Sequence, residues 1–342
     1  MSDALLTIVV PTYNRAAYLQ RLLQTLRTEL DGLHDEVQVL VSDNASTDHT
    51  SSLLHSLKTQ WPALIVQRNQ SNLGADGNFC ECMDRVETRY CWFIGDDDLP
   101  KVGVVRQIVT LLHKTSPTLV YMQSEWFASI TGPGQGESVG ALRADAMDAL
   151  AFARRVHVWL TFISGVILDR SLLMQRLGKH TIRRFTGTSL VQLGWVLPLL
   201  QSDGHFIFIN DRCMLATKDN TGGYPLLSVF GVGFARIANE TFGRGSRMAD
   251  ILIGRSIVHY LPGLTWGARQ APSGRHSDED PWPGMRAELG GWPMYWLLLV
   301  PLGQFPGWLA QPVYQAWRVF HRLSRELQKL REHVQLRRRS AR

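Results

Sequence analysis

Cysteine is scarce in the 342-residue sequence, which contains four: Cys80, Cys82, Cys91 and Cys213. So few cysteines in a chain of this length exclude a disulfide-rich miniprotein. The first two form a C-x-C pair rather than the C-x-x-C of zinc ribbons, and no histidine stands close enough to complete a site, so zinc is not expected. We predict buried free thiols in a reducing compartment.

Long apolar runs are also missing. The nearest candidate for a membrane-spanning helix, residues 290–314, is interrupted by four prolines, whereas a span needs about 18 or more consecutive apolar residues. The first four residues, MSDA, carry no positive charge, and the apolar run at 5–10 is too short for the core of a signal peptide. We therefore expect a cytoplasmic protein without a spanning helix.

Excess positive charge is absent from most of the chain, although the formal net charge is +6. Residues 318–342 contain nine Lys and Arg against two Glu, a net charge of +7, which leaves the other 317 residues near −1. A nucleic-acid-binding domain more often spreads basic residues over a folded face, so we expect no nucleic-acid partner.

The basic C-terminal segment also has an apolar periodicity. Apolar residues recur in steps of four and three: Ala316, Phe320, Leu323, Leu327, Leu330 and Val334. This spacing predicts a basic amphipathic helix, which could lie on an anionic membrane surface together with the tryptophan-rich, proline-broken stretch before it. The alternative is a helix that packs on the protein core or forms a short coiled coil.

The first part of the chain alternates between strand-like and helix-like segments. Expected strands are residues 5–10, 37–41, 64–67, 90–94 and 118–123, and expected helices are 15–30, 47–57, 77–86 and 102–112. A further strand (164–168), helix (189–201) and strand (205–209) follow, and the alternation fades beyond about residue 225. Short connections between alternating strands and helices predict an α/β fold with a doubly wound, mostly parallel sheet.

Polar clusters follow four of the expected strands, at 11–15, 42–48, 69–78 and 95–98. The carboxyl ends of parallel strands meet at one edge of the sheet, where ligands bind in such folds. The sequence contains neither G-x-G-x-x-G nor a P-loop there, so neither a Rossmann dinucleotide site nor a P-loop is indicated.

Asp96, Asp97 and Asp98 form the sharpest of these features. Three adjacent carboxylates repel one another, and a hard divalent cation such as Mg²⁺ or Mn²⁺ resolves the repulsion. The alternative is an acidic cap for the helix expected at 102–112, favoured by the helix dipole.

Two other clusters offer groups for a nucleotide. Asp43 can accept a hydrogen bond from a base or a ribose hydroxyl, because Asp48 is expected to cap the following helix and leave Asp43 free. Tyr13 can stack on a base and Arg15 can neutralise phosphate. The alternatives are a helix cap for Asp43 and a turn with a surface arginine for Arg15.

Four motifs together resemble family 2 glycosyltransferases: PTYNR at 11–15, SDNASTDHT at 42–50, NLGADGNF at 72–79 and GDDDLP at 95–100. The subgroup that they resemble most is that of the abequosyltransferase-like enzymes of surface-polysaccharide assembly. The likeness is firm over about residues 5–125 and weaker over 160–225, which includes SGVILDR at 164–170 and NTGGY at 220–224.

The resemblance implies a GT-A fold divided into three parts. Residues 1–125 would bind the nucleotide-sugar, 126–225 would form the acceptor side of the same catalytic domain, and 226–342 would be a largely helical, Trp-rich, basic extension. The implied activity is transfer of a sugar, a deoxyhexose by the subgroup likeness, from a nucleotide-diphosphate sugar to a glycan acceptor. A lipid-linked acceptor would suit a protein held on the inner face of the cell membrane.

Site residues also follow from the resemblance. The donor would contact a set of side chains around the first strands: Pro11, Tyr13, Arg15, Asp43, Asn44, Asp76, Asp96 and Lys218. Asp97 and Asp98 would hold Mn²⁺ or Mg²⁺, with Asp98 also catalytic, because Gly95 stands where the first Asp of the usual D-x-D is found. Lys218 and the NTGGY loop could close over the diphosphate.

The catalytic base departs from the family pattern. The expected position, on the acceptor side, is Gln192, and glutamine cannot take a proton. Other carboxylates that could serve are Asp169, Asp203 and Glu125, or the reaction lacks a conventional base. Two other functions stay open: a nucleotidyltransferase acting on sugar phosphates, and an inactive sugar-binding scaffold.

Overall fold

The computed structural model describes residues 4–127, 138–217, 225–270 and 280–340, and the side chains of these residues other than 180, 325 and 327–340. The chain divides into two compact units, Met1–Gly222 and Gly223–Arg342. The unit boundary lies close to the start of the extension expected at residue 226. Each unit is described by itself.

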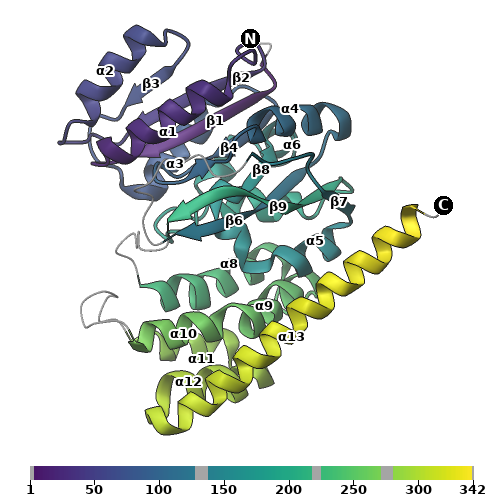
Figure 1. Ribbon diagram of the computed structural model, residues 1–342. Coiled ribbons are helices and arrows are strands. Elements are labelled where there is room, and N and C mark those ends of the chain that lie inside the picture. Colours follow the sequence, from purple (N-terminus) through teal and green to yellow (C-terminus); the bar gives the residue numbers. More distant parts are fainter. Residues whose placement is uncertain (1–3, 128–137, 218–224, 271–279, 341–342) are drawn as a thin grey trace. The chain divides into compact units, whose positions relative to one another are not determined.

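The first unit is built on one nine-stranded sheet with the order β3-β2-β1-β4-β8-β6-β9-β5, and β7 pairs with β9 (Figure 1). Its strands are β1 (Leu6–Thr12), β2 (Val37–Asp43), β3 (Ile65–Arg68), β4 (Tyr90–Phe93), β5 (Leu99–Pro100), β6 (Leu119–Phe127), β7 (Ala144–Met147), β8 (Val166–Asp169) and β9 (Phe206–Thr217). Strands β3, β2, β1 and β4 are parallel, β8 runs against β4 and β6, and β9 is parallel to β6. The expected doubly wound, mostly parallel sheet is confirmed.

Seven α-helices connect and cover these strands: α1 (Ala16–Glu29), α2 (Thr50–Gln60), α3 (Gly74–Arg85), α4 (Val104–Thr115), α5 (Ala149–Val156), α6 (Arg170–Leu177) and α7 (Leu193–Leu199). Every residue of β1 is buried, as expected for a parallel strand covered on both faces. Helix α4 buries an apolar stripe that includes Val105, Ile108 and Leu112 against the same core. The expected helices of this unit all exist, with shifted ends.

Among its described residues, the second unit has helices joined by short turns and no strand. It contains α8 (Phe234–Phe242), α9 (Arg247–His259), α10 (Leu261–Gln270), α11 (Trp282–Leu289), α12 (Val300–Gln304) and the long α13 (Gly307–Ser340), with π-helical turns at Ser228–Gly233 and Tyr295–Leu299. Within the described part of the chain, no helix has both the length and the apolar character needed to cross a bilayer. All four cysteines are free and buried, as predicted.

Candidate active site

The acidic turn after β4 is held by partners from three other segments. Thr12, at the end of β1, donates to Asp96 Oδ2 at 2.7 Å, and Arg15 Nη1 lies 3.1 Å from Asp96 Oδ1 and 3.7 Å from Asp97 Oδ1. Ser164 donates to Asp98 Oδ2 at 2.5 Å. Asp96 and Asp97 therefore share Arg15, whereas Asp98 is held by Ser164.

Gly95 leaves the space that these carboxylates need. A Cβ at this position would lie 3.1 Å from Asp97 Oδ1 and 3.2 Å from Asp98 Oδ2. Both oxygens thus face the point from which a side chain at residue 95 would project. A side chain at this first position of a D-x-D would therefore crowd both carboxylates unless they moved by a few tenths of an ångström.

Burial raises the pKa of two of these carboxyl groups. The pKa of Asp96 rises to about 6 because burial outweighs the nearby charge of Arg15. The pKa of Asp98 rises to about 8 because of burial and then the negative charge of Asp97, against the hydrogen bond from Ser164. Burial therefore disfavours the charged forms of Asp96 and Asp98, and Asp98 holds its proton up to about neutral pH.

The metal-free protein is expected to lose stability as pH rises from about 4 to 8. The folded pKa values of Asp96 and Asp98 lie above the ordinary value of 3.8, so the folded state holds these two protons more tightly than the unfolded state does. Their contribution to the free energy of unfolding is complete below pH 3.8 and is lost as pH rises through about 6 and 8. Melting curves of wild type and Asp98→Asn should diverge in favour of the variant as pH rises. Parallel curves across this range would contradict the assignment to Asp98.

Ser164 links the acidic turn to the segment before β8. Its Oγ accepts a hydrogen bond from Gly95 N at 2.9 Å while donating to Asp98, and its carbonyl accepts from Trp92 Nε1 at 2.9 Å. The side chain of Ser164 is fully buried. Ser164 therefore orients the carboxylate of Asp98 and the turn together.

Ser164→Ala is expected to lower activity, and the affinity for any cation that Asp98 would hold, by roughly tenfold, because the carboxylate of Asp98 loses the donor that orients it. Titration of Mn²⁺ into the variant, alongside turnover, measures the effect. Ser256→Ala is the matched control, since the Ser256 hydroxyl is equally buried but only bonds Leu252 O within a helix. Equal Mn²⁺ affinity in the two variants would show that Ser164 does not support cation binding.

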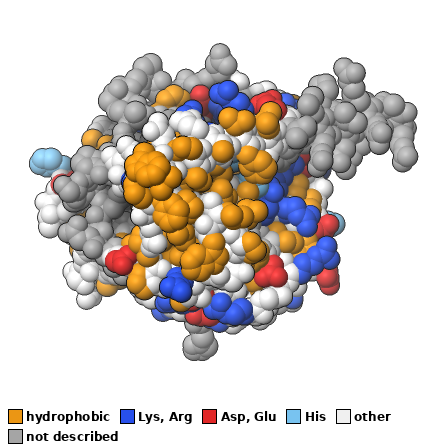
Figure 2. Space-filling view, turned by 90° about the horizontal axis from the view of Figure 1, so that it is seen from below, with side chains coloured by type: hydrophobic (Ala, Val, Ile, Leu, Met, Phe, Trp, Pro, Cys, Tyr) orange, Lys and Arg blue, Asp and Glu red, His pale blue; other side chains and the backbone are white. Residues whose placement is uncertain are grey.

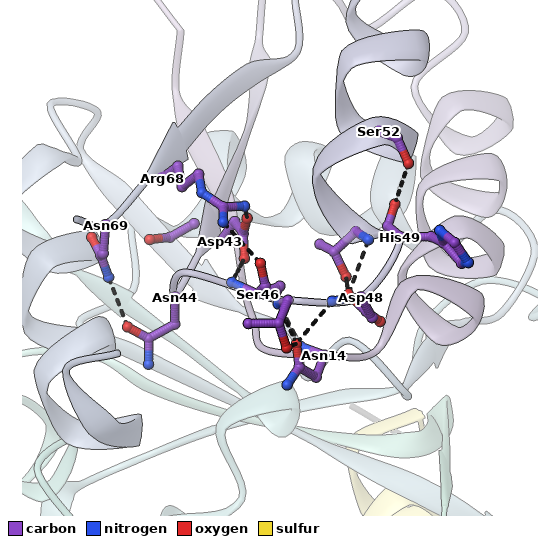
Figure 3. Close-up of polar contacts among 12 residues, drawn as sticks. Asn14, Asp43, Asn44, Ser46, Asp48, His49, Ser52, Arg68 and Asn69 are labelled. Carbon is purple, nitrogen blue, oxygen red and sulfur yellow. Dashed lines mark hydrogen bonds and ion pairs between the residues drawn. The ribbon is translucent and has the colours of Figure 1, made fainter. Parts of the chain in front are cut away.

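The loops after β1 and β2 form one hydrogen-bonded cluster (Figure 3). Asn14 Oδ1 accepts from Thr47 N at 2.7 Å, and Asn14 N donates to Ser46 Oγ at 2.9 Å. Asp48 Oδ1 accepts from the backbone and hydroxyl of Thr50 at 3.0 and 2.6 Å, so it serves the first turn of α2 as expected. Asn14 has a φ of 54°, a left-handed conformation that asparagine tolerates well.

Asp43 is not free, so this expectation was wrong. Its Oδ1 accepts from Ser46 N at 2.9 Å, and its Oδ2 pairs with Arg68 Nη1 at 2.5 Å (Figure 3). The register of β2 and β3 places Arg68 directly opposite Asp43. Arg68 also donates to Ser46 O at 2.8 Å and keeps 44% of its side chain exposed, which makes it the part of this pair that a ligand can reach.

Asn44 is held by neighbouring amides. It donates to Asn72 Oδ1 at 2.8 Å and to Gly74 O at 3.1 Å, and its oxygen accepts from Asn69 Nδ2 and Leu73 N, both at 3.0 Å. These bonds tie the end of β2 to the start of α3. Asn44 thus shapes the loop, and its contact with a donor stays a prediction.

The other predicted residues of the first strand differ in exposure. Pro11 is buried within β1, whereas Tyr13 is 40% exposed just beyond it, at the edge where β1 and β2 end. Arg15 pairs with Asp96 and Asp97, and its predicted contact with phosphate stays a prediction. Tyr13 therefore keeps a face that can stack on a base, and Arg15 lies beside the acidic turn.

Asp76 connects the donor side to the segment before α7. In the first turn of α3, its Oδ2 accepts from Gly187 N at 2.8 Å and from Ser189 N at 2.9 Å. Gln192, the residue before α7, donates from Nε2 to Thr161 O at 3.0 Å, three residues before Ser164. The structure thus ties Gln192 to the segment that holds Asp98, and the roles of Asp76 and Gln192 towards ligands stay predictions.

Two of the possible bases lie at the wrong edge of the sheet. Asp203 is an exposed residue before β9, whose start lies at the amino ends of β4 and β6. Asp169 ends the antiparallel β8 opposite Tyr90 at the start of β4, caps α6 through Leu172 N and pairs with Arg89. The predictions for Asp203 and Asp169 are therefore wrong, because the acidic turn follows the carboxyl end of β4.

Glu125 remains near the acidic turn. It lies in the second half of β6, opposite Leu215, which also pairs with Leu99. Its carboxylate accepts from Lys101 Nζ at 2.8 Å, and this hydrogen bond lowers the pKa of Glu125. Lys218 and the NTGGY loop lie outside the described residues, directly after Thr217, which donates to Asp97 O at 3.2 Å.

Arg68 and Ser164 are the site residues that the sequence interpretation missed. Arg68 ends the expected third strand, so the rule that polar residues gather at strand ends would have found it. Ser164 opens the SGVILDR stretch, which carried a family likeness but no assigned role. Its importance depends on the antiparallel β8, which brings it next to Gly95.

A cavity of about 730 Å³ lies away from this chemistry. It is formed at the C-terminal ends of α1 and α2, the opposite edge of the sheet, by Arg27, Thr28, Asp31, His34, Gln60, Trp61, Pro62 and Ala63. In the described part of the chain, no group of three or more His, Cys, Asp or Glu side chains is arranged to hold a metal ion. A cation at the acidic turn would therefore need further ligands from a bound molecule.

Comparison with known proteins matches residues 7–138 to the model of glycosyl transferase family 2. An abequosyltransferase, RfbV of Salmonella typhimurium, is 35% identical over 95 residues, 28% of each chain. The GalNAc(5)-diNAcBac-PP-undecaprenol beta-1,3-glucosyltransferase of Campylobacter jejuni is 25% identical over 128 residues, 37% of each. The chain thus matches little more than a third of these relatives' lengths at most.

Solved structures show the fold over nearly the whole chain. TarS 1-349 of S. aureus in complex with UDP-GlcNAc has a TM-score of 0.60 at 16% identity, covering 94% of this chain and 92% of that one. PcManGT of Pyrobaculum calidifontis, in complex with GDP-Man and Mn²⁺, has a TM-score of 0.50 at 14% identity, covering 92% and 86%. With the sheet and strand-end loops described above, these matches show that the chain has a GT-A-type fold and that its residues 7–138 match glycosyl transferase family 2, with similarity to an abequosyltransferase.

Proposed function

We propose that the protein transfers a sugar from a nucleotide-diphosphate sugar to a glycan acceptor in surface-polysaccharide synthesis. The observation that carries this proposal is the shared edge of the sheet. The acidic turn with Asp97 and Asp98 follows β4, and the Asp43–Arg68 pair ends β2 and β3, with β1 between them. Such an edge binds a nucleotide at one side and a diphosphate beside it.

The donor would lie along this edge. Tyr13 offers an exposed ring for the base, and Arg68 offers a half-exposed guanidinium beside the buried Asp43. The abequosyltransferase similarity over 95 residues supports a deoxyhexose as the transferred sugar. Asp76 would fix the position of residues 187–189 beside the donor, and Asn44 would fix residues 72–74, through the hydrogen bonds described above.

The chemistry of the acidic turn suits Mn²⁺ or Mg²⁺. Asp97 Oδ1 and Asp98 Oδ2 face the same point beside Gly95, and carboxylate oxygens are the ligands that these cations prefer. Burial, and then the negative charge of Asp97, raises the pKa of Asp98, and a bound cation would oppose both effects by favouring the charged carboxylate. When bound, the ion would neutralise the charge that develops on the leaving diphosphate. Arg15, already beside Asp96 and Asp97, would add to that positive field.

The acceptor would approach from the side of Gln192. Gln192 can orient an acceptor hydroxyl but cannot remove its proton, so a carboxylate is needed for an inverting reaction. Of the three carboxylates considered, Glu125 is the one at the correct edge, and its ion pair with Lys101 would have to open first. The Campylobacter jejuni relative, named for an undecaprenol-linked acceptor, supports a lipid-linked glycan and a place on the inner face of the cell membrane.

A panel of UDP-, GDP-, CDP- and dTDP-sugars, each with and without Mn²⁺, tests this function through hydrolysis and thermal stabilisation. We expect one donor to be hydrolysed slowly in a cation-dependent way and to raise the melting temperature. Asp203→Asn should behave as wild type, since Asp203 lies at the other edge. Consumption of a sugar-1-phosphate with a nucleoside triphosphate would instead favour a nucleotidyltransferase, and binding of no donor would favour a scaffold.

A further inference from the structure

Helix α13 leaves an apolar stripe uncovered by its own unit. Its first turns bury Ala310 and Trp317, and Trp317 Nε1 donates to Val258 O at 2.7 Å. On another side of the helix, Val319, Phe320 and Leu323 are 61%, 52% and 57% exposed. Phe320 and Leu323 of the stripe predicted from the sequence are thus largely exposed, although one side of the Phe320 ring stacks on His259 of α9.

Large apolar side chains are also exposed just before this stripe. Trp308 is 74% exposed and Leu297 is 61% exposed, among six such residues within sixteen positions: Met294, Trp296, Leu297, Phe305, Trp308 and Leu309. Figure 2 shows hydrophobic side chains gathered on the face seen from below, with Lys and Arg at its margin. A concentration of this kind marks an interaction surface rather than ordinary surface residues.

Positive charge accompanies the apolar side chains. Arg318 and Arg322 are exposed next to Val319 and Leu323, and residues 318–342 carry a net charge of +7. A second copy packed along this stripe would bring two such segments together, and their charges would repel each other. An anionic surface that also accepts apolar side chains satisfies both features.

We propose that residues 294–323, with the basic continuation of α13, bind the surface of an anionic lipid bilayer. Trp308 and its apolar neighbours would enter the interface, and the arginines of α13 would contact the lipid headgroups. The 34 residues of α13 are about 50 Å long and are not apolar enough to cross, so the helix would lie along the surface. This inference rests on the proposed function for its purpose, since it would bring the site to a lipid-linked acceptor.

Co-sedimentation of the full chain with vesicles tests the proposal. Wild type should bind phosphatidylcholine vesicles that contain about one-third phosphatidylglycerol, bind pure phosphatidylcholine weakly, and be released by high salt. Trp308→Ser should weaken binding roughly tenfold. The double variant Arg318→Gln, Arg322→Gln should weaken it by about 25-fold, at about fivefold for each basic residue near the surface. Ile65→Ser, at a 40% exposed position of β3, is the matched control and should bind as wild type.

Hydrolysis of the water-soluble donor separates this inference from the proposed function. Trp308→Ser should hydrolyse the donor as wild type does, because it alters only the membrane surface. The inference would be overturned, whatever the donor result, if wild type showed no preference for anionic vesicles. It would also be overturned if Trp308→Ser and the arginine variant both bound the vesicles as tightly as wild type does. A dimer in light scattering that Phe320→Ser converts to monomer would also overturn it, because a second copy would then cover the stripe.

Discussion

Asp97→Asn should lower the rate of sugar transfer by about a thousandfold while the protein keeps its fold. The substitution removes one of two carboxylates that face the point beside Gly95 but keeps the size and polarity of the side chain. Loss of a group that stabilises developing charge costs about two to three orders of magnitude, and loss of a bound cation costs more. Steady-state turnover in saturating Mn²⁺ measures the effect, and circular dichroism checks the fold.

The matched control is Asp203→Asn, the same chemical change in the same unit at the opposite edge of the sheet. We expect its turnover to lie within about twofold of wild type, as for surface substitutions away from a site. Asp97→Asn should also melt no earlier than wild type, because it removes a negative charge from a crowded turn. Near-normal turnover in Asp97→Asn, or equal losses in both variants, would show that the acidic turn does not serve catalysis.

Arg68→Ala should destabilise the first unit by about 2 kcal/mol and abolish detectable donor binding. The carboxylate of Asp43 is 1% exposed and would lose the guanidinium that pairs with it, keeping the bond from Ser46 N. Removing one member of a buried pair costs about 3–5 kcal/mol, reduced here because Arg68 is half-exposed. Chemical denaturation and thermal melting, with a fall of about 5 °C, measure the change.

A double variant isolates the cause of this loss. Arg68→Ala combined with Asp43→Asn should be more stable than Arg68→Ala alone, because no uncompensated charge is then buried. The amide oxygen introduced by Asp43→Asn could still accept the bond from Ser46 N, so the loop after β2 would keep its anchor. A double variant at least as unstable as the sum of the single changes would mean that the ion pair does not hold this loop.

The sequence predicted those strands that can be recognised from the apolar residues within their own few positions. Strands β1 and β2 are rich in apolar residues because both faces of the parallel sheet are covered, and their residues 6–12 and 37–43 are almost all buried. Strand β5 has two residues, and β7 alternates between exposed and half-buried positions, so neither has a distinct pattern. Strand β9 continues through the polar residues 210–212 and ends at Thr217. The register against β6 shifts around these polar residues.

The sequence predicted where the site residues lie, because polar residues follow the strand ends, but it did not predict which side chains pair with them. Asp43 pairs with Arg68 because the register of β2 and β3 sets them opposite each other, and register is a tertiary property. Asp169 and Asp203 were misplaced because β8 is antiparallel and β9 starts at the far edge. In α13, periodicity predicted an apolar stripe that includes the exposed Phe320 and Leu323, but it could not tell which side of the helix packs on the unit.

Isothermal titration of UDP, CDP, GDP and dTDP, each with and without Mn²⁺, tests the central claim most directly. The claim is that Asp97 and Asp98 bind a cation together with a nucleoside diphosphate. One diphosphate should bind at least about tenfold more tightly with Mn²⁺, and the variant that combines Asp97→Asn with Asp98→Asn should lose this gain. Equal affinities with and without Mn²⁺ for all four, in wild type and variant alike, would contradict it.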